Sequence, residues 1–177
     1  GWSAIEVDVF VFFLSRDTEG QCIVVRSEGY QVVRVSTHAI ETEFSSYAVV
    51  NDAIAMVFQQ DGHTFYLIVF PSADKTWAYD ITSGEWHEWT WTDPETREEH
   101  RHRINCVTHA YNRQVMGDWE NGGLYALDPD TFTDAGDPIV RIRDFPHLVK
   151  DGKRLSYSSF IADMDVGNAP GTGEGEE

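Results

Sequence analysis

Two acidic side chains near one predicted turn are the first residues in this chain that could do chemistry. Asp80 lies at the end of one strand-like run, and Glu88 lies in the next run after the turn Thr82–Glu85. A pair of carboxyl groups can hydrolyse a glycosidic bond, with one acting as acid and the other as nucleophile or base. The chain has 30 acidic residues, so some carboxylates will be neighbours by chance. The pair alone therefore does not predict a glycosidase.

Four histidines offer a possible metal site. His100 and His102 can place two imidazoles on one side of an extended segment, and His87 or His109 would have to supply a third ligand. A zinc site also needs an ordered second shell around those ligands. The surrounding segment is strongly charged, which favours solvated histidines, and we expect no metal here.

Two loops resemble known motifs without completing them. Residues 128–134 resemble a calcium-binding loop, but Phe132 stands where an oxygen ligand is needed and no glycine follows it. Residues 72–77 resemble the Asp-box turn of sialidase-like propellers, but the segment is two residues short and lacks the glycine. Both segments are expected to be ordinary turns.

No other catalytic signature occurs in the sequence. There is no Gly-x-Ser-x-Gly nucleophile motif and no glycine-rich phosphate loop. The six tryptophans and seven tyrosines could stack on sugars, but aromatic residues at strand spacing are typical of a core. The prediction is that the protein is not an enzyme, with no catalytic residue, cofactor or metal. A carbohydrate-binding or carbohydrate-active β-propeller remains the alternative.

Composition limits the class of partner. The 177 residues are 41% hydrophobic and 13% aromatic, enough for a packed core, and the net charge is -17. A surface this acidic repels nucleic acid, so sequence-specific nucleic-acid binding is not expected. The basic residues Arg101 and Arg103 are expected to be neutralised by Glu98 and Glu99. No apolar run is long enough to span a bilayer, and no basic segment precedes the apolar residues 9–14, so neither membrane insertion nor a signal peptide is expected.

The two cysteines lack the spacing of a zinc site. Cys22 and Cys106 each lie in an apolar, strand-like run. We expect both to be buried free thiols in a reducing compartment.

The elements that must position all these residues are predominantly strands. Residues 63–91 alternate apolar and polar side chains in three runs separated by turns, which predicts consecutive antiparallel strands. Similar units cover about 7–36, 53–91 and 104–144, and a repeat near 45 residues is typical of propeller blades. The fold class is therefore mainly β: a propeller-like array of about three antiparallel blade units, with a sandwich of hairpins as the structural alternative.

Other segments complete the predicted domain, which spans 1–166. A short amphipathic helix is expected at about 37–48, capped by Ser36 or Thr37. Residues 92–103 are expected to form a long exposed hairpin between blades. Residues 155–166 again alternate like a strand, and 167–177 have the composition of a flexible acidic tail. Since the outer strands have no visible neighbours, the chain looks like a fragment of a larger protein.

Several segments, taken in order, resemble the packaged-DNA stabilisation proteins of short-tailed bacteriophages. The matching segments are Gly29–Ile40, Gly62–Pro71, Lys75–Asp80, Gly84–Glu88, Arg101–Arg103, Gly117–Asp118, Gly123–Asp130, Pro138–Arg141 and Pro146–Leu148. Family members are longer than this chain. The resemblance implies a structural virion component, a tail accessory or head-completion protein that closes the portal channel and holds the genome in.

The resemblance also implies partners and a location. It predicts other tail and portal proteins as partners, homo-oligomers in the assembled virion, and assembly in the cytoplasm of the bacterial host. Contacts between such proteins are expected at blade edges and inter-blade loops, where aromatic anchors are usual. The predicted partner-binding residues belong to the loop at 92–103 and to the strand before it: Trp86, Trp89, Trp91, Glu95, Glu98 and Glu99.

Overall fold

The computed structural model describes residues 2–134, 136–140, 156–159 and 161. The chain divides into two compact units, Gly1–Pro129 and Asp130–Glu177. The described part of the second unit contains one short hairpin, β14 (Thr133–Asp134) with β15 (Asp137–Pro138). The predicted tail at 167–177 and most of the predicted strand at 155–166 lie outside the described residues. The described positions 156–159 and 161 belong to no strand.

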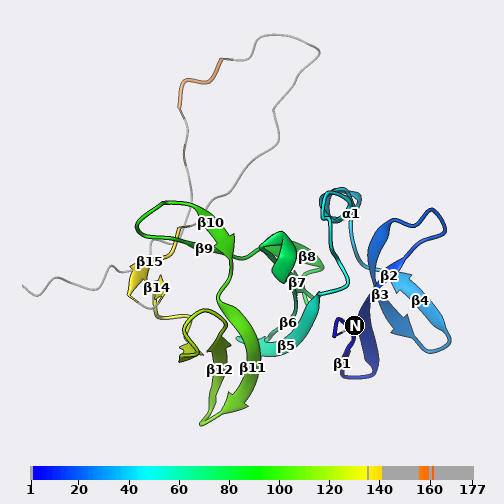
Figure 1. Cartoon of the computed structure of the whole chain (residues 1–177), viewed down its shortest axis with the longest axis horizontal. Helices are drawn as coiled ribbons and strands as arrows, with labels where there is room; N and C mark the ends of the chain where they lie inside the picture. Colours follow the sequence, from blue (N-terminus) through cyan, green and yellow to red (C-terminus); the bar gives the residue numbers. More distant parts are fainter. Residues whose placement is uncertain (1, 135, 141–155, 160, 162–177) are drawn as a thin grey trace, which may run out of the picture. The chain divides into compact units, whose positions relative to one another are not determined.

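The first unit contains three successive antiparallel sheets, which we call blades 1 to 3 (Figure 1). Blade 1 consists of β1 (Ile5–Val7), β2 (Phe10–Arg16), β3 (Cys22–Glu28) and β4 (Gln31–Arg34), paired in that order. Blade 2 consists of β5 (Ile54–Gln60), β6 (His63–Phe70), β7 (Lys75–Asp80) and β8 (Glu85–Glu88), with a 3-10 turn at Pro71–Ala73 between β6 and β7. The predicted mainly β, blade-like class is confirmed.

Within the described residues blade 3 has three strands, whereas alternation over residues 104–144 predicts four. It consists of β11 (Ile104–Ala110), β12 (Arg113–Asp118) and β13 (Leu124–Leu127). The fourth strand was expected at 138–143. Within the described residues β15 pairs with β14 rather than with β13, and residues 141–143 lie outside the described part.

The central blade is buried on both faces because of strict alternation along β6. Tyr66, Ile68 and Phe70 are fully buried in a cluster with residues of blade 1 and the helix. Leu67 and Val69, which point the other way, are fully buried in a second cluster with residues of blade 3. Blade 2 therefore packs between blades 1 and 3, the face-to-face arrangement of successive propeller blades.

The first strand of each blade lies next to the first strand of the following one. β5 contacts both β1 and β11. The Ala55 amide donates a hydrogen bond of 3.0 Å to the Trp2 carbonyl, and Trp2 bridges Ile54 in parallel. On the other side, the Gln114 side chain donates to the Gln59 carbonyl. The turns that follow these first strands consequently gather at one end of the unit.

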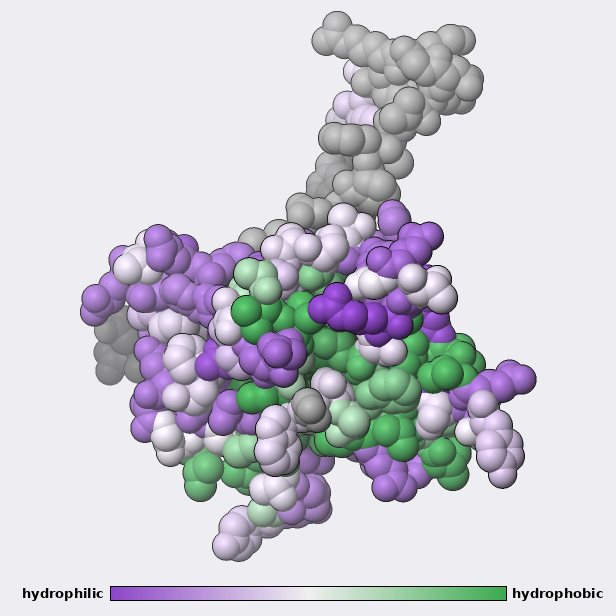
Figure 2. Space-filling model, turned by 45° about the vertical axis from the view of Figure 1, so that its right-hand side comes forward, coloured by the Kyte–Doolittle hydropathy of each residue, from purple (hydrophilic) through white to green (hydrophobic). Residues whose placement is uncertain are grey.

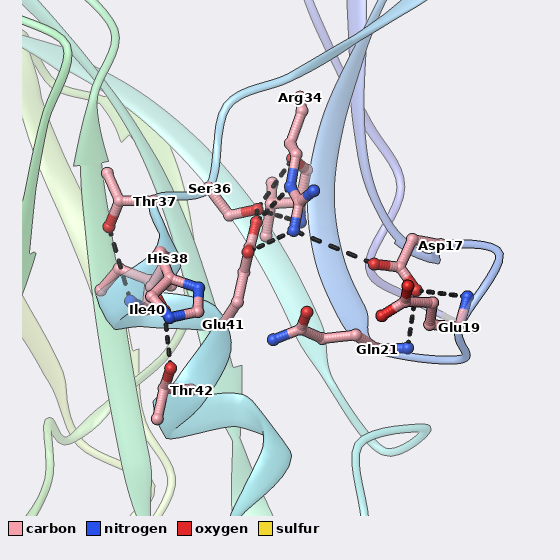
Figure 3. Close-up of polar contacts among 11 residues, drawn as sticks. Asp17, Glu19, Gln21, Arg34, Ser36, Thr37, His38, Ile40, Glu41 and Thr42 are labelled. Atoms are coloured by element: carbon pink, nitrogen blue, oxygen red, sulfur yellow. Dashed lines mark hydrogen bonds and ion pairs between the residues drawn. The ribbon is translucent and has the colours of Figure 1, made fainter.

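One helix, α1 (His38–Ser45), connects blade 1 to blade 2, as predicted. Thr37 caps it by accepting from the Ile40 amide, and Ile40 and Phe44 are buried against the blades. Glu41 is also buried, which the amphipathic pattern did not predict. Its carboxylate accepts hydrogen bonds from the Arg34 guanidinium and from the Ser36 hydroxyl (Figure 3).

This ion pair fixes the helix to blade 1. The Ser36 hydroxyl also accepts from the Val24 amide at 3.0 Å, so the network reaches the middle of β3. Burial alone would raise the pKa of Glu41, but the hydrogen bonds from Arg34 and Ser36 hold it below the ordinary value. Glu41 is therefore ionised at neutral pH, and its charge is compensated within the fold.

The two cysteines differ from expectation in one respect. Both are free, and Cys22 is buried as predicted, but Cys106 is exposed. Cys106 pairs with Gly117 on the face of blade 3 that points away from blade 2. No neighbouring sheet covers that face within the described residues, which is why the alternation of β11 leaves the thiol open.

Candidate functional site

The predicted hairpin between blades 2 and 3 exists and has a defined shape. Strands β9 (Thr90–Thr92) and β10 (Glu99–Arg101) pair in antiparallel register, with His100 opposite Trp91. The carboxylate of Asp93 accepts from the Glu95 amide at 2.7 Å and from the Thr96 amide at 3.2 Å. These hydrogen bonds lower the pKa of Asp93 and hold the turn in one conformation.

Asp74 anchors the hairpin to blade 2. Its carboxylate lies 2.8 Å from Nδ1 of His100 and accepts from the Arg101 amide at 3.1 Å. The hydrogen bond to Asp74 raises the pKa of His100. Asp74 itself has a φ of 55°, a left-handed conformation that aspartate tolerates better than most residues. The turn at residues 72–77 is therefore a structural anchor, a role that its sequence did not predict.

Cation–π and ionic contacts anchor the hairpin to blade 3. The Arg101 guanidinium lies 4.1 Å from the centre of the Trp119 ring, and Arg103 lies 5.0 Å from the ring of Trp91. Arg103 also forms ion pairs with Asp118 at 2.7 Å and with Glu120 at 3.2 Å. The prediction that Glu98 and Glu99 neutralise this basic run is wrong for Arg103, whose ion pairs are with Asp118 and Glu120.

His102 lies between Arg101 and Arg103 in the sequence, and its side chain is neutral at pH 7. Its Nδ1 accepts from the Ile104 amide at 3.2 Å, and its ring lies 5.3 Å from that of Trp89. Burial lowers the pKa of His102 to about 4. Since His100 hydrogen-bonds to Asp74 and His102 accepts from the Ile104 amide, the two imidazoles have separate partners. No group of three or more potential metal-binding side chains occurs among the described residues.

The three predicted tryptophans are half-buried rather than freely exposed. The Trp86 ring lies 5.0 Å from that of Tyr79 in a tilted arrangement, and its indole N–H donates to the Val35 carbonyl, so Trp86 joins blade 2 to the end of blade 1. Trp89 contacts the rings of Phe58 and Phe65 within the second core cluster. Both side chains therefore have internal packing roles.

Trp91 differs from the other two tryptophans, because its indole N–H forms no hydrogen bond within the described residues. Its ring lies beneath Arg103 and beside His100, and its indole N–H is buried without an acceptor among the described residues, so only the half-buried ring is open to a partner. Trp91 remains a candidate contact residue, and a binding role for Trp86 and Trp89 remains a prediction.

The three glutamates of the hairpin are all exposed. Glu95, Glu98 and Glu99 lie on or beside the turn, and none of them forms an ion pair within the part of the chain that the structure describes. The hairpin therefore presents these three glutamates around the exposed Arg97, a tip of net negative charge on a base held by Asp74 and Trp119. The sequence did not predict Asp74 and Trp119 as anchors. The position of the aromatic Trp119 directly after Asp118 was a visible signal for the second of them.

The candidate carboxylate pair is not arranged for glycoside hydrolysis. Asp80 accepts from His63 at 2.7 Å, from the Ser83 hydroxyl at 2.8 Å and from the Thr82 amide at 2.9 Å. Burial alone would raise its pKa, but these hydrogen bonds hold the pKa of Asp80 at about 2. Glu88 instead forms an ion pair with Lys75, at the other end of the β7–β8 pairing. Asp80 organises a turn, and neither residue is a poised general acid.

The calcium-like segment at 128–134 spans the boundary between the two compact units and forms no defined cation site among the described residues. Within those residues, moreover, no helix has the length and apolar character that crossing a membrane would require.

A family model described as bacteriophage P22 Gp10, beta-propeller, matches residues 3–132. This match includes all three blades and the whole β9–β10 hairpin. No curated protein matches the chain.

Proposed function

The chain belongs to the family of the bacteriophage P22 Gp10 β-propeller, and we propose that it is a tail accessory protein of a phage or prophage virion. Members of this family are phage structural proteins. In the proposed role the protein binds other tail or portal proteins, closes the portal channel and so stabilises packaged DNA. The family match over the three blades is the observation that carries this proposal.

The charge of the chain supports a role near DNA without attachment to it. A net charge of -17 repels the phosphate backbone, because stable DNA binding requires lysines and arginines to displace counterions. A channel wall built from such a protein would not retain the duplex during ejection. Copies of the chain would form a ring around the channel in the virion, assembled in the host cytoplasm.

The β9–β10 hairpin is the proposed contact with another tail protein. Its turn is held by Asp93 and its base by Asp74, so little conformational freedom is lost when it binds. Exposed Glu95, Glu98 and Glu99 would contact basic side chains of the partner, and Trp91 would add apolar contact. Charges of this kind chiefly raise the association rate and set specificity.

A charge-matched pair of variants tests this contact. The triple variant Glu95→Gln, Glu98→Gln, Glu99→Gln should weaken pull-down of purified tail and portal components. The control triple variant Glu6→Gln, Glu19→Gln, Glu85→Gln removes the same charge from three exposed positions elsewhere. Equal binding by both variants would reject the hairpin as the contact. Absence of binding by the wild-type protein would reject the tail role itself.

A further inference from the structure

Successive blades pack through equivalent strand positions. We call the face of a blade that points to the following blade its forward face, and the opposite side its backward face. The fourth residue of the second strand lies on the backward face: Tyr66 in blade 2 and Met116 in blade 3, both buried. The Tyr66 ring stacks on Phe12 of blade 1, with ring centroids 5.4 Å apart, and Met116 packs in the cluster that blades 2 and 3 share. One packing scheme therefore serves both contacts.

The forward face of blade 3 has the pattern of such a contact, but no blade covers it among the described residues. Leu124 is 76% exposed, and Cys106 is exposed as well. The equivalent positions of blade 2, Ala78 and Met56, are buried. The side chains in the middle of this face are all uncharged: Cys106, Thr108, Val115, Gly117, Leu124 and Ala126. In a chain that is 24% charged, a neutral exposed sheet face indicates a surface that binds a partner.

The side chains on this face are smaller than those on the forward face of blade 2. Gly117 is the fifth residue of its strand, where blade 2 has Leu67. A Cβ atom added at Gly117 would lie 2.7 Å from Cys106 Sγ, so a larger side chain does not fit there. Thr108 takes the position of Phe58. Because sheet interfaces are closely packed, a sheet that covers this face must supply the large side chains itself.

The backward face of blade 1 offers such side chains. Phe13 is the fourth residue of β2 and thus the equivalent of Tyr66, but it is only half-buried, since no blade precedes blade 1 in the described part of the chain. Its sheet neighbour Val25 is buried, while Val11 is 38% and Val32 is 61% exposed. Figure 2, turned to bring the side of blade 1 forward, shows apolar residues in green at the surface. Blade 1 therefore has the large side chains that the forward face of blade 3 lacks.

Charges at the rims of these two faces are opposite. Blades stack with their first strands side by side, since β5 contacts both β1 and β11. A second copy stacked on blade 3 in this way brings Asp8 of its first turn beside the exposed Arg113, which closes the β11–β12 turn. Such complementary rim charges favour association. Glu6, the next-to-last residue of β1, stays outside the contact, because its equivalents Gln59 and His109 remain exposed in the packed blades.

We propose that two copies of this chain associate, each covering the forward face of the other's blade 3 with the backward face of its own blade 1. The two equivalent contacts join two sets of three blades into a ring of six, and propellers usually contain about four to eight. The described part of the second compact unit has strands of only two residues, so it supplies no further blade. This association does not depend on the proposed virion role.

Sedimentation of the full-length protein tests the association. The wild type should be a dimer. Leu124→Lys places a charge in the middle of the forward face of blade 3 and should give a monomer, because burying an unpaired charge is costly. Val49→Lys adds the same charge at an exposed position after α1 and should leave the dimer intact. A monomeric wild type would overturn the inference, as would dimeric Leu124→Lys, and neither result would affect the proposed virion role.

Mixing two variants tests the pairing of unlike faces. Val11→Lys disables the backward face of blade 1 and should also be a monomer. An equimolar mixture of Val11→Lys and Leu124→Lys retains one contact between unaltered faces, so dimers should reappear. Dimeric Val11→Lys would indicate a contact between two blade 3 faces, and this result or a mixture without dimers would overturn the proposed pairing. Melting followed by circular dichroism verifies that each variant is folded.

The thiol of Cys106 gives a test that needs no substitution. Cys106 lies on the forward face of blade 3, so it should react quickly in dilute protein, where the copies are separate. At concentrations where sedimentation shows mainly dimer, its reaction with a thiol reagent should be several-fold slower. Cys22 is buried within the single copy and serves as the internal reference. Equal rates for Cys106 at both concentrations would overturn the covering of this face.

Discussion

His100 Nδ1 lies 2.8 Å from the carboxylate of Asp74, and this contact joins the β9–β10 hairpin to the middle blade. Asp74 raises the pKa of His100 through that hydrogen bond. The imidazolium form is therefore stabilised in the folded protein, at the base of the proposed binding hairpin.

The first prediction concerns this proton. Since the pKa of His100 is raised on folding, its contribution to stability is fully present below the ordinary histidine pKa of 6.5 and is lost as the pH rises through the raised value. Amide hydrogen exchange in residues 90–101 should accelerate with pH beyond its intrinsic dependence. In Asp74→Asn the raised pKa should be lost in an NMR titration. An unchanged His100 titration in that variant would contradict the assignment.

The second prediction has the opposite sign and concerns His102. Its pKa is lowered to about 4, so the unfolded chain takes up a proton more readily than the folded protein between pH 6.5 and 4. The free energy of unfolding should therefore fall as the pH is lowered through this window. His102→Gln should flatten that part of the stability curve measured by urea unfolding. The same slope in wild type and variant would show that another group is responsible.

The opposite behaviour of two histidines only two residues apart was not predictable from the sequence. The charged segment suggested solvated imidazoles for both. One side chain instead meets Asp74, 26 residues earlier, and the other lies against Trp89. Both contacts require the hairpin to fold back between two blades, and alternation within a strand carries no information about that step.

The third prediction concerns the buried carboxylate of Glu41. Glu41→Gln removes the charge that accepts hydrogen bonds from Arg34 and Ser36 and should lower the melting temperature by about 2–4 °C. The effect is modest because Arg34 is nearly half exposed and solvent screens the ion pair. Glu19→Gln, at an exposed position near the same network, is the control and should change little. Equal melting temperatures for all three proteins would show that the pair does not stabilise α1.

The fourth prediction concerns the two thiols. A thiol reagent such as DTNB should modify Cys106 quickly in the native protein, because its side chain is exposed. Cys22 should react only on unfolding, because burial shields its thiol and raises its pKa. Mass spectrometry of the modified peptides identifies the site. Rapid modification of Cys22 would contradict the burial of β3, and no modification of Cys106 would contradict the placement of β11.

The fold was more predictable than the candidate site. Period-two alternation and turn residues predicted the three consecutive strands within 63–91, the helix near Thr37 and the hairpin at 92–103. Alternation assigns residues to faces of a sheet, but it does not say which faces a neighbouring sheet covers. Cys106 lies on an uncovered face and Trp86 on a covered one, so their exposures could not be predicted.

The central claim is that this chain is a virion component that keeps packaged DNA inside the particle. The most direct measurement compares particles assembled with and without the protein, by quantifying nuclease-resistant DNA after packaging. We expect particles without the protein to release their DNA to the nuclease, and addition of purified protein after packaging to restore protection. Equal protection in the two kinds of particle would contradict the account.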